Sequence, residues 1–140
     1  MSSFVTPLVV SPLASGRRWR LVFPFTYHRG SKRSNKIIKV PKGFDTDFAS
    51  IPKLLWLFPY WAKYSKASVL HDFLYWLAHQ PVDVILSYFY KINIARKEAD
   101  DIFHEAMLVE WRDHRLGVLL AHIEYRGVRL FGWLAWEIKK

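Results

Sequence analysis

The sequence contains no cysteine among its 140 residues. This absence excludes a disulfide framework, a thiolate metal site and a cysteine nucleophile. A metal ion could therefore be held only by His, Asp or Glu side chains. Such ligands favour hard or borderline ions, of which zinc, manganese and magnesium are the natural candidates.

The sequence also lacks a long hydrophobic run and a targeting signal. The nearest candidate for a membrane span, Leu116–Ile138, is interrupted by four polar side chains, at His122, Glu124, Arg126 and Arg129. The N-terminal segment MSSFVTPLVVSPL has no basic region followed by a long apolar core, so it does not resemble a signal peptide. We therefore expect no transmembrane segment and a protein that acts in the cytoplasm of the cell that produces it.

Acidic residues are scarce relative to basic ones. The chain has 12 acidic and 21 basic residues, which gives a net charge of +9. Such a balance attracts nucleic acid, an anionic membrane surface or an acidic protein, and it does not choose among them. A nucleic-acid surface would use the sheet-side cations with their neighbouring aromatic residues, namely Arg17, Arg18, Arg20, Arg29, Lys32 and Arg33 with Trp19 and Tyr27.

Hydrophobic residues make up 51% of the chain and aromatic residues 17%. This is enough to build one core, so we expect a folded chain rather than a disordered one. There are no internal repeats, low-complexity segments or linkers, which predicts a single domain over residues 1–140.

The chain is organised as strands first and helices afterwards. Residues 1–45 predict a small antiparallel sheet of about three strands, at Phe4–Val10, Trp19–Phe25 and Lys36–Val40, with Thr26–Asn35 as a polar hairpin loop. Residues 50–140 predict three to four packed helices, at Ile51–Phe58 with Ser50 as N-cap, Ser65–His79, Ala95–Arg112 and Leu116–Trp136, the last bent near Gly127. Val82–Tyr90 is either a short helix or a hydrophobic insertion. The predicted fold class is α+β.

Three segments hold polar residues in apolar surroundings. GFDTDFASIP joins the sheet to the helices and carries Asp47, LHDFLYW carries His71 and Asp72, and EADDIFHEAM carries Asp100. Residues four apart share a helix face, so His71 is expected to lie beside Tyr75. Burying an unpaired charge is costly, so we expect the four residues to converge where the sheet enters the helices.

Such a cluster has two interpretations. It could be a metal site, with His71, Asp72 and Asp100 as ligands and Asp47 as a further ligand or general base, while Arg96 and Tyr75 hold an anionic group of the substrate. It could equally be a buried polar junction, in which His71 bridges buried backbone, Asp72 pairs with a basic residue and Asp47 caps the helix that follows. The residues alone slightly favour the junction.

The same three segments resemble a family of bacteriophage and prophage proteins known only as domain of unknown function 1353. The family pattern falls on five segments of this chain, Thr6–Leu8, Gly43–Pro52, Ser68–Tyr75, Arg96–Phe103 and Tyr125–Trp133. Pro81–Ile94 is longer and more apolar than the corresponding loop of the family. The polar positions that its motifs single out are Thr46, Asp47, Ser50, His71, Asp72, Tyr75, Arg96 and Asp100.

The resemblance implies a phage or prophage origin and supplies no activity. A phage protein of this kind would act in the cytoplasm of the infected bacterium or become part of the virion. We favour a non-catalytic virion, assembly or host-interaction component that binds other phage proteins or a host protein. The alternatives are a metal-assisted hydrolase acting on a phosphodiester or cell-wall substrate, and a nucleic-acid-binding protein.

Overall fold

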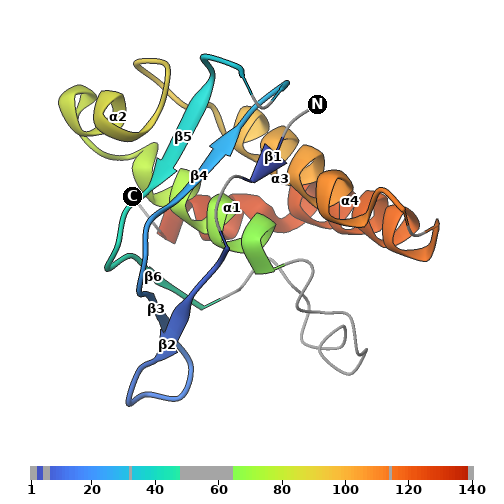
Figure 1. Ribbon diagram of the computed structural model, residues 1–140, viewed down its shortest axis with the longest axis horizontal. Helices are drawn as coiled ribbons and strands as arrows, with labels where there is room; N and C mark the ends of the chain where they lie inside the picture. The colour runs from blue at the N-terminus through green and yellow to red at the C-terminus, as the bar shows by residue number, and fades with distance from the viewer. Residues whose placement is uncertain (1–2, 5–6, 32, 48–64, 114, 139–140) are drawn as a thin grey trace.

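The computed structural model describes residues 3–4, 7–31, 33–47, 65–113 and 115–138 (Figure 1). Within these ranges, six short strands come first, at β1 Ser3–Phe4, β2 Val10–Pro12, β3 Trp19–Leu21, β4 Phe25–His28, β5 Ile37–Val40 and β6 Asp45–Thr46. Four helices follow, at α1 Ser65–Leu77, α2 Val82–Tyr88, α3 Arg96–Trp111 and α4 Arg115–Ile138. The predicted α+β class is confirmed.

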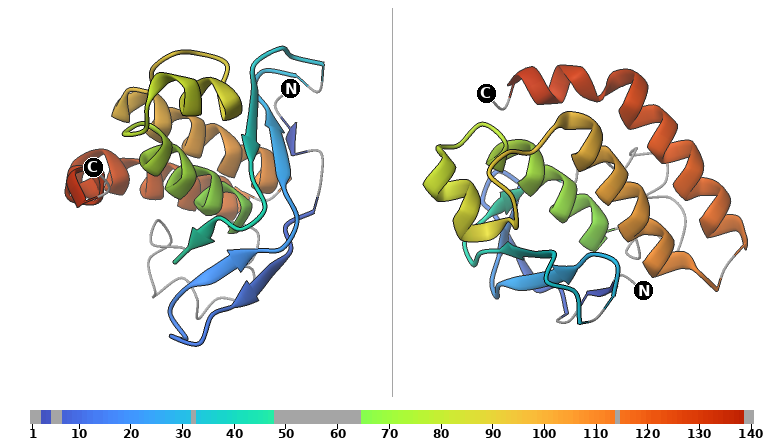
Figure 2. Two further views of the ribbon diagram at one scale, coloured as in Figure 1. Left: turned by 90° about the vertical axis from the view of Figure 1, so that its left-hand side faces the viewer. Right: turned by 90° about the horizontal axis from the view of Figure 1, so that it is seen from above.

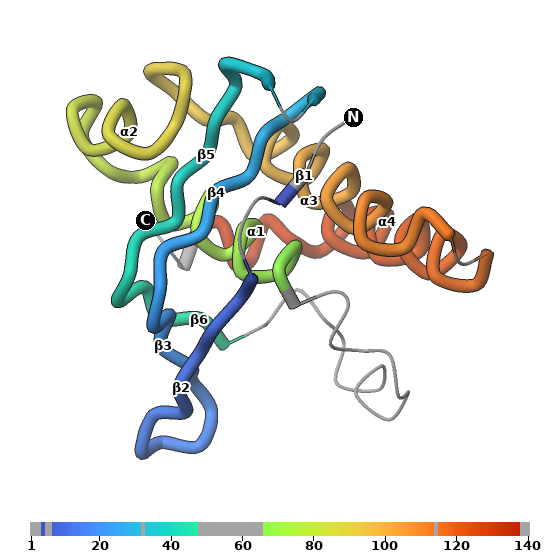
Figure 3. Tube along the Cα trace, in the orientation of Figure 1, coloured from blue at the N-terminus to red at the C-terminus, as the bar shows by residue number. Residues whose placement is uncertain are grey.

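The strands form two antiparallel sheets, one in the order β1-β4-β5 and the other in the order β2-β3-β6. The chain passes from one sheet to the other between β3 and β4 (Figure 3). The strand predicted at Trp19–Phe25, with a break at Pro24, is shorter than expected. Strand β3 ends at Leu21, and the chain bends at 22–23, just before Pro24, which cannot continue a ladder.

Two further strand predictions need correction. Thr26–Asn35 was expected to be loop, but Phe25–His28 is β4, and its first and third side chains are buried while the others are half-buried. The polar residues between the aromatic ones made the segment look like a loop, although its side chains alternate between buried and half-buried as in a strand. GFDTDFASIP, for which no strand was predicted, contains β6, which pairs with β3. This pairing holds the start of the GFDTDFASIP motif on the sheet.

Helix α1 lies at the centre of the molecule. Every side chain from Ala67 to Tyr75 is buried, which confirms that this helix is surrounded on most sides. The sheets lie on one side of it and α4 lies on the other (Figure 2). Polar residues on α1 are therefore forced into the interior, where they need hydrogen-bond partners.

Helices α3 and α4 are joined by a short connection and pack against each other along most of their lengths. Helix α4 forms the outermost layer and changes direction along its length (Figure 2). Val82–Tyr90, predicted to be either a short helix or a hydrophobic insertion, contains the short helix α2. The helix predicted at Ile51–Phe58 lies outside the described residues. No helix in the described ranges is long and apolar enough to cross a membrane.

Candidate functional site: a buried carboxylate with four donors

The centre of the site is Asp100 on α3, whose side chain is fully buried. His71 Nε2 lies 2.7 Å from Asp100 Oδ1, and the Tyr75 hydroxyl donates to the same oxygen at 2.6 Å. His71 and Tyr75 are four residues apart on α1, so one helix face presents both to α3. His71 lies beside Tyr75 as expected, and of the four residues predicted to converge, His71 and Asp100 meet directly.

The second oxygen of Asp100 faces two guanidinium groups. Arg129 Nη1 donates to Oδ2 at 2.7 Å, and Arg96 Nη1 lies 3.4 Å from the same atom. A carboxylate can accept about four hydrogen bonds, so Asp100 is close to its full capacity. Three helices therefore meet at one carboxylate, since His71 and Tyr75 come from α1, Asp100 and Arg96 from α3 and Arg129 from α4.

The orientation of the His71 ring is set by stacking. The ring stacks on Phe103, with centroids 4.6 Å apart, and lies 4.2 Å from the ring of Tyr75. An ionised carboxylate can only accept, so the proton of the short bond belongs to His71 Nε2 when Asp100 is ionised. Burial, reinforced by the bond to Asp100, raises the pKa of Tyr75, so its hydroxyl remains a donor. The hydrogen bond to Asp100 likewise raises the pKa of Arg129.

Arg96 connects α4 to this cluster through hydrogen bonds. Besides Asp100, its guanidinium contacts the backbone carbonyl oxygens of Val128 and Arg129 at 3.3–3.4 Å. The close approach of α4 to α1 depends on Gly132, because a Cβ at that position would lie only 2.6 Å from the Tyr75 hydroxyl oxygen. Arg96 and Tyr75 were predicted to hold an anionic substrate group, and in the structure both bind Asp100 instead.

Asp72 forms a second polar contact, on the side of α1 that faces β6. The Thr46 hydroxyl donates to Asp72 Oδ2 at 2.6 Å, and both side chains are buried. Side chains alternate between the two faces of a strand, so when Thr46 points inward the next residue, Asp47, points outward. The side chain of Asp47 is exposed. The predicted set thus separates into His71 with Asp100, Asp72 with Thr46, and Asp47 at the surface.

The ligand geometry of a metal site is not found in the described ranges, where no group of three or more His, Asp or Glu side chains is arranged to hold an ion. The charges around Asp100 give a physical reason. Two guanidinium groups already neutralise this carboxylate, and they would repel an incoming cation. What the arrangement can do is fix the packing of three helices through one saturated acceptor.

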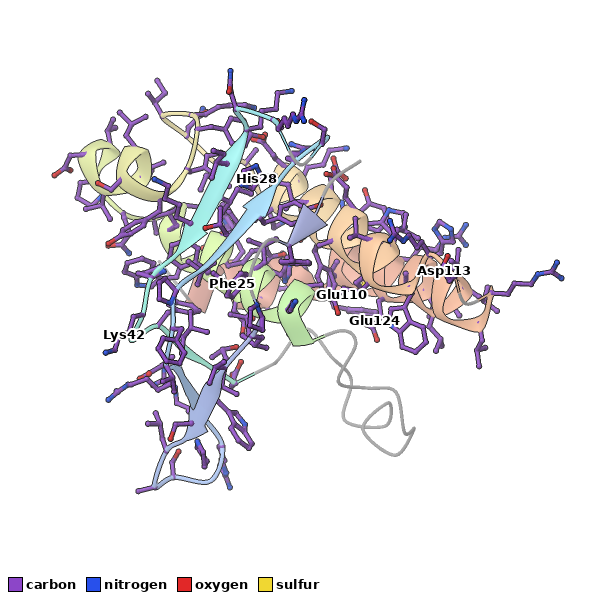
Figure 4. The ribbon with its side chains drawn as sticks, viewed as in Figure 1. Phe25, His28, Lys42, Glu110, Asp113 and Glu124 are labelled. Atoms are coloured by element: carbon purple, nitrogen blue, oxygen red, sulfur yellow. The ribbon has the colours of Figure 1, made fainter. Side chains whose placement is uncertain are left out.

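Two residues of the interior were not singled out by sequence. Arg129 was named only among the polar residues that interrupt Leu116–Ile138, although it lies on one row of α4 with Tyr125, Gly132 and Trp136. The Tyr125 hydroxyl bonds Asp101, so this row faces α3. Glu124, labelled in Figure 4, is buried on the same helix, and burial raises its pKa to about 8.

The residues predicted to bind nucleic acid also lie in different environments. Tyr27 is fully buried and donates to Glu105, while Arg29 bonds Glu105 and Glu98. Arg20 is held by Asp45 through both oxygens. Lys32 lies outside the described residues. Arg17, Arg18 and Arg33 are exposed.

Comparison with protein-family models matches residues 19–128 to the family described as protein of unknown function, DUF1353. The chain belongs to this family. The match covers the strands from β3 onward, α1, α2, α3 and the first half of α4. It includes Asp72, Asp100 and their partners Thr46, His71, Tyr75 and Arg96, while Arg129 lies just beyond it. No curated protein and no solved structure matches the chain.

Proposed function

We propose that this DUF1353 protein is a non-catalytic, phage-encoded component that works by binding another protein, a partner from the phage or its bacterial host. The observation that carries the proposal is the saturation of Asp100, which is fully buried and has four donors around it. A catalytic carboxylate must reach a substrate, a water molecule or a metal ion. Asp100 could do so only after one of its present partners left.

The surface that would bind the partner is the outer face of α4. It consists of seven large apolar side chains, each more than half exposed, namely Leu116, Leu119, Ile123, Leu130, Phe131, Trp133 and Leu134. Monomeric proteins rarely expose a contiguous patch of such residues without an interaction to cover it. Leu119 and Leu130, like Ile123 and Leu134, are three turns apart, so the patch follows one side of the helix.

The charges around this face indicate the chemistry of the partner. The exposed cations Arg115 and Arg126 lie on the same helix, and the whole chain has a net charge of +9. A second copy of the chain would bring like charges together, which disfavours self-association. We infer a partner with an apolar groove and acidic residues along its rim.

The proposed phage origin is supported by the resemblance of the sequence motifs, and with it we propose the cytoplasm of the infected bacterium or the virion as the location. Two competing functions have their own tests. A metal-assisted hydrolase predicts that zinc, manganese or magnesium copurifies or raises the melting temperature. A nucleic-acid-binding protein predicts an affinity for DNA or RNA that falls steeply with salt.

The decisive experiment compares two kinds of variant in the virus that encodes the chain. Leu130→Glu with Leu134→Glu places charge on the outer face of α4, whereas Tyr75→Phe removes one donor from Asp100. We expect the first to abolish phage yield, or incorporation into purified particles measured by mass spectrometry, without lowering the melting temperature. Tyr75→Phe should lower the melting temperature slightly and leave yield intact.

Ile92→Glu is the matched control, because Ile92 is 62% exposed, close to the 67% of Leu130, and lies outside α4. It should behave like the unmodified chain. The opposite pattern, in which folded Tyr75→Phe or Asp100→Asn protein is inactive and the α4 variant is active, would establish a catalytic site and end the proposal. Binding of the α4 face to lipid vesicles rather than to a protein would also overturn it.

A further inference from the structure

A cleft of about 490 Å³ opens beside α1 and is lined by other residues than those around Asp100. It lies between the turn that joins β5 to β6 and the surface of α1 and α2. Its walls are three partly buried aromatic rings, those of Phe44, Trp76 and Tyr88, and its rim carries Arg18 and Lys42. Lys42 is labelled in Figure 4 at the edge of the molecule. This volume falls in the range of small-molecule sites.

The aromatic walls are held in place from behind by one buried residue. Phe73 packs its ring against Phe44 at 5.1 Å, against Tyr88 at 5.7 Å and against Trp76 at 5.8 Å between centroids. Phe73 itself is fully buried. Since a buried ring cannot rotate freely in a close-packed core, the three walls are preorganised rather than loose.

The rim is held by a tight turn. Phe44 N bonds the carbonyl oxygen of Pro41, which closes a turn with Lys42 and Gly43 at its centre. Gly43 has φ +87, which is the conformation that the third residue of a type II turn requires. The next backbone bond, from Gly43 N to the carbonyl of Leu21, ties this turn to β3. Lys42 is thus presented at a defined point of the cleft.

Most of the polar side chains that line the described part of the cleft are hydrogen-bond donors. Among the described residues that line the cleft, Asp45 is the one acid. Arg20 bonds both of its carboxylate oxygens, and these bonds, helped by the charge of Arg18, lower the pKa of Asp45. Within the described part of the chain, the Lys42 ammonium, the Trp76 indole N–H and the Tyr88 hydroxyl have no hydrogen-bond partner. The cleft therefore offers positive charge and donors beside flat apolar walls.

We propose that this cleft binds an aromatic base bearing a phosphate group, with the base against Trp76 and Tyr88 and the phosphate at Arg18 and Lys42. Stacking on aromatic side chains and phosphate contacts from Lys and Arg are the two elements of nucleotide recognition that do not depend on a sequence motif. The ligand is either a free nucleotide or one unit of a single-stranded nucleic acid. Both share the chemistry that the cleft recognises.

The test is a titration of the full chain with adenosine 5′-monophosphate, followed by the NMR signal of the Trp76 indole N–H, which Trp76→Phe assigns. We expect saturable binding that weakens at least about tenfold in Lys42→Ala, because a charge-assisted phosphate contact is lost. Lys39→Ala is the matched control, since Lys39 is an exposed cation on β5 that does not line the cleft. It removes the same charge and should leave the affinity unchanged.

Three further ligands complete the experiment. Adenosine without phosphate and inorganic phosphate without the base should each bind more weakly than the monophosphate. A short single-stranded oligonucleotide distinguishes the sources, because tighter, Lys42-dependent binding of the oligonucleotide would identify nucleic acid as the natural ligand. Equal losses in Lys42→Ala and Lys39→Ala, equal affinity for phosphate alone, or no saturation up to about 10 mM monophosphate would each overturn the proposal.

Discussion

The two polar regions that adjoin α1 use their hydrogen-bonding groups in opposite ways. Around Asp100, donors from four side chains share one buried carboxylate, and two of these side chains are guanidinium groups that neutralise its charge. In the cleft beside Trp76, the described lining includes the donor side chains of Arg18, Lys42, Trp76 and Tyr88, while the acid Asp45 is already bonded by Arg20. A buried group must be satisfied within the fold, whereas a group at an open surface can be left for a ligand. The contrast assigns folding to the first region and binding to the second.

The largest effect should come from Asp100→Ala. Removing the carboxylate leaves His71, Arg96 and Arg129 without their shared acceptor, and breaking a buried ion pair typically costs about 3–5 kcal/mol. Urea denaturation should show this loss. Asp113→Ala is the control, because its side chain is 94% exposed and should change the free energy of unfolding by less than about 0.5 kcal/mol. A small loss in Asp100→Ala would contradict the structural role of the cluster.

Glu124 should make stability depend on pH. Burial raises its pKa to about 8 in the folded chain, against about 4.3 in an unfolded one. Between these values the folded state keeps a proton that the unfolded state releases, so stability falls as pH rises. The slope should be about 1 kcal/mol per pH unit from roughly pH 5 to pH 8, and the loss should level off above that.

The measurement is the free energy of unfolding of the unmodified chain and of Glu124→Gln at several pH values. The difference between the two isolates Glu124 from every other titrating group. It should change across this window in the direction that favours the variant at high pH. Parallel curves would mean that Glu124 is ionised and solvated in the folded chain.

Much of the fold could be predicted from sequence because the pattern was local. Strong apolar runs located α1 and α3 to within two residues at each end, and the spacing of His71 and Tyr75 placed them on one face. The strands were harder, since β6 has only two residues and gains its stability from pairing with β3, which no local pattern reveals.

The candidate site was predictable in its members and not in its geometry. His71, Asp72 and Asp100 stood out because polar residues are costly in apolar helices. The sequence could not show that Asp72 turns to Thr46 while Asp100 turns to α4, since this depends on how the helices pack. Arg129 was missed because one arginine in a basic chain does not differ, by sequence, from those that face solvent.

Gly132→Ala should cost about 1–3 kcal/mol, because the new methyl group would lie 2.6 Å from the Tyr75 hydroxyl and must push α4 away. Gly127→Ala is the same substitution on the same helix, and nothing lies within 4 Å of its Cβ, so it should stabilise the helix by up to about 1 kcal/mol. In a Tyr75→Phe background the cost at 132 should shrink, since the clashing atom is gone. A double-mutant cycle measures this coupling, and strict additivity would show that α4 does not approach Tyr75 this closely.

The smallest effect tests the other half of the comparison. Lys42→Ala and Arg18→Ala should each change the free energy of unfolding by less than about 0.5 kcal/mol, because neither cation supports the fold through a buried partner. Thermal denaturation at low and high salt checks this, and a net charge reduced from +9 should make the variants slightly more stable at low salt. If instead either variant lost as much stability as Asp100→Ala, the cleft would be part of the folding framework. Its donors would then be committed to the protein, and the separation between a region that folds and a region that binds would fail.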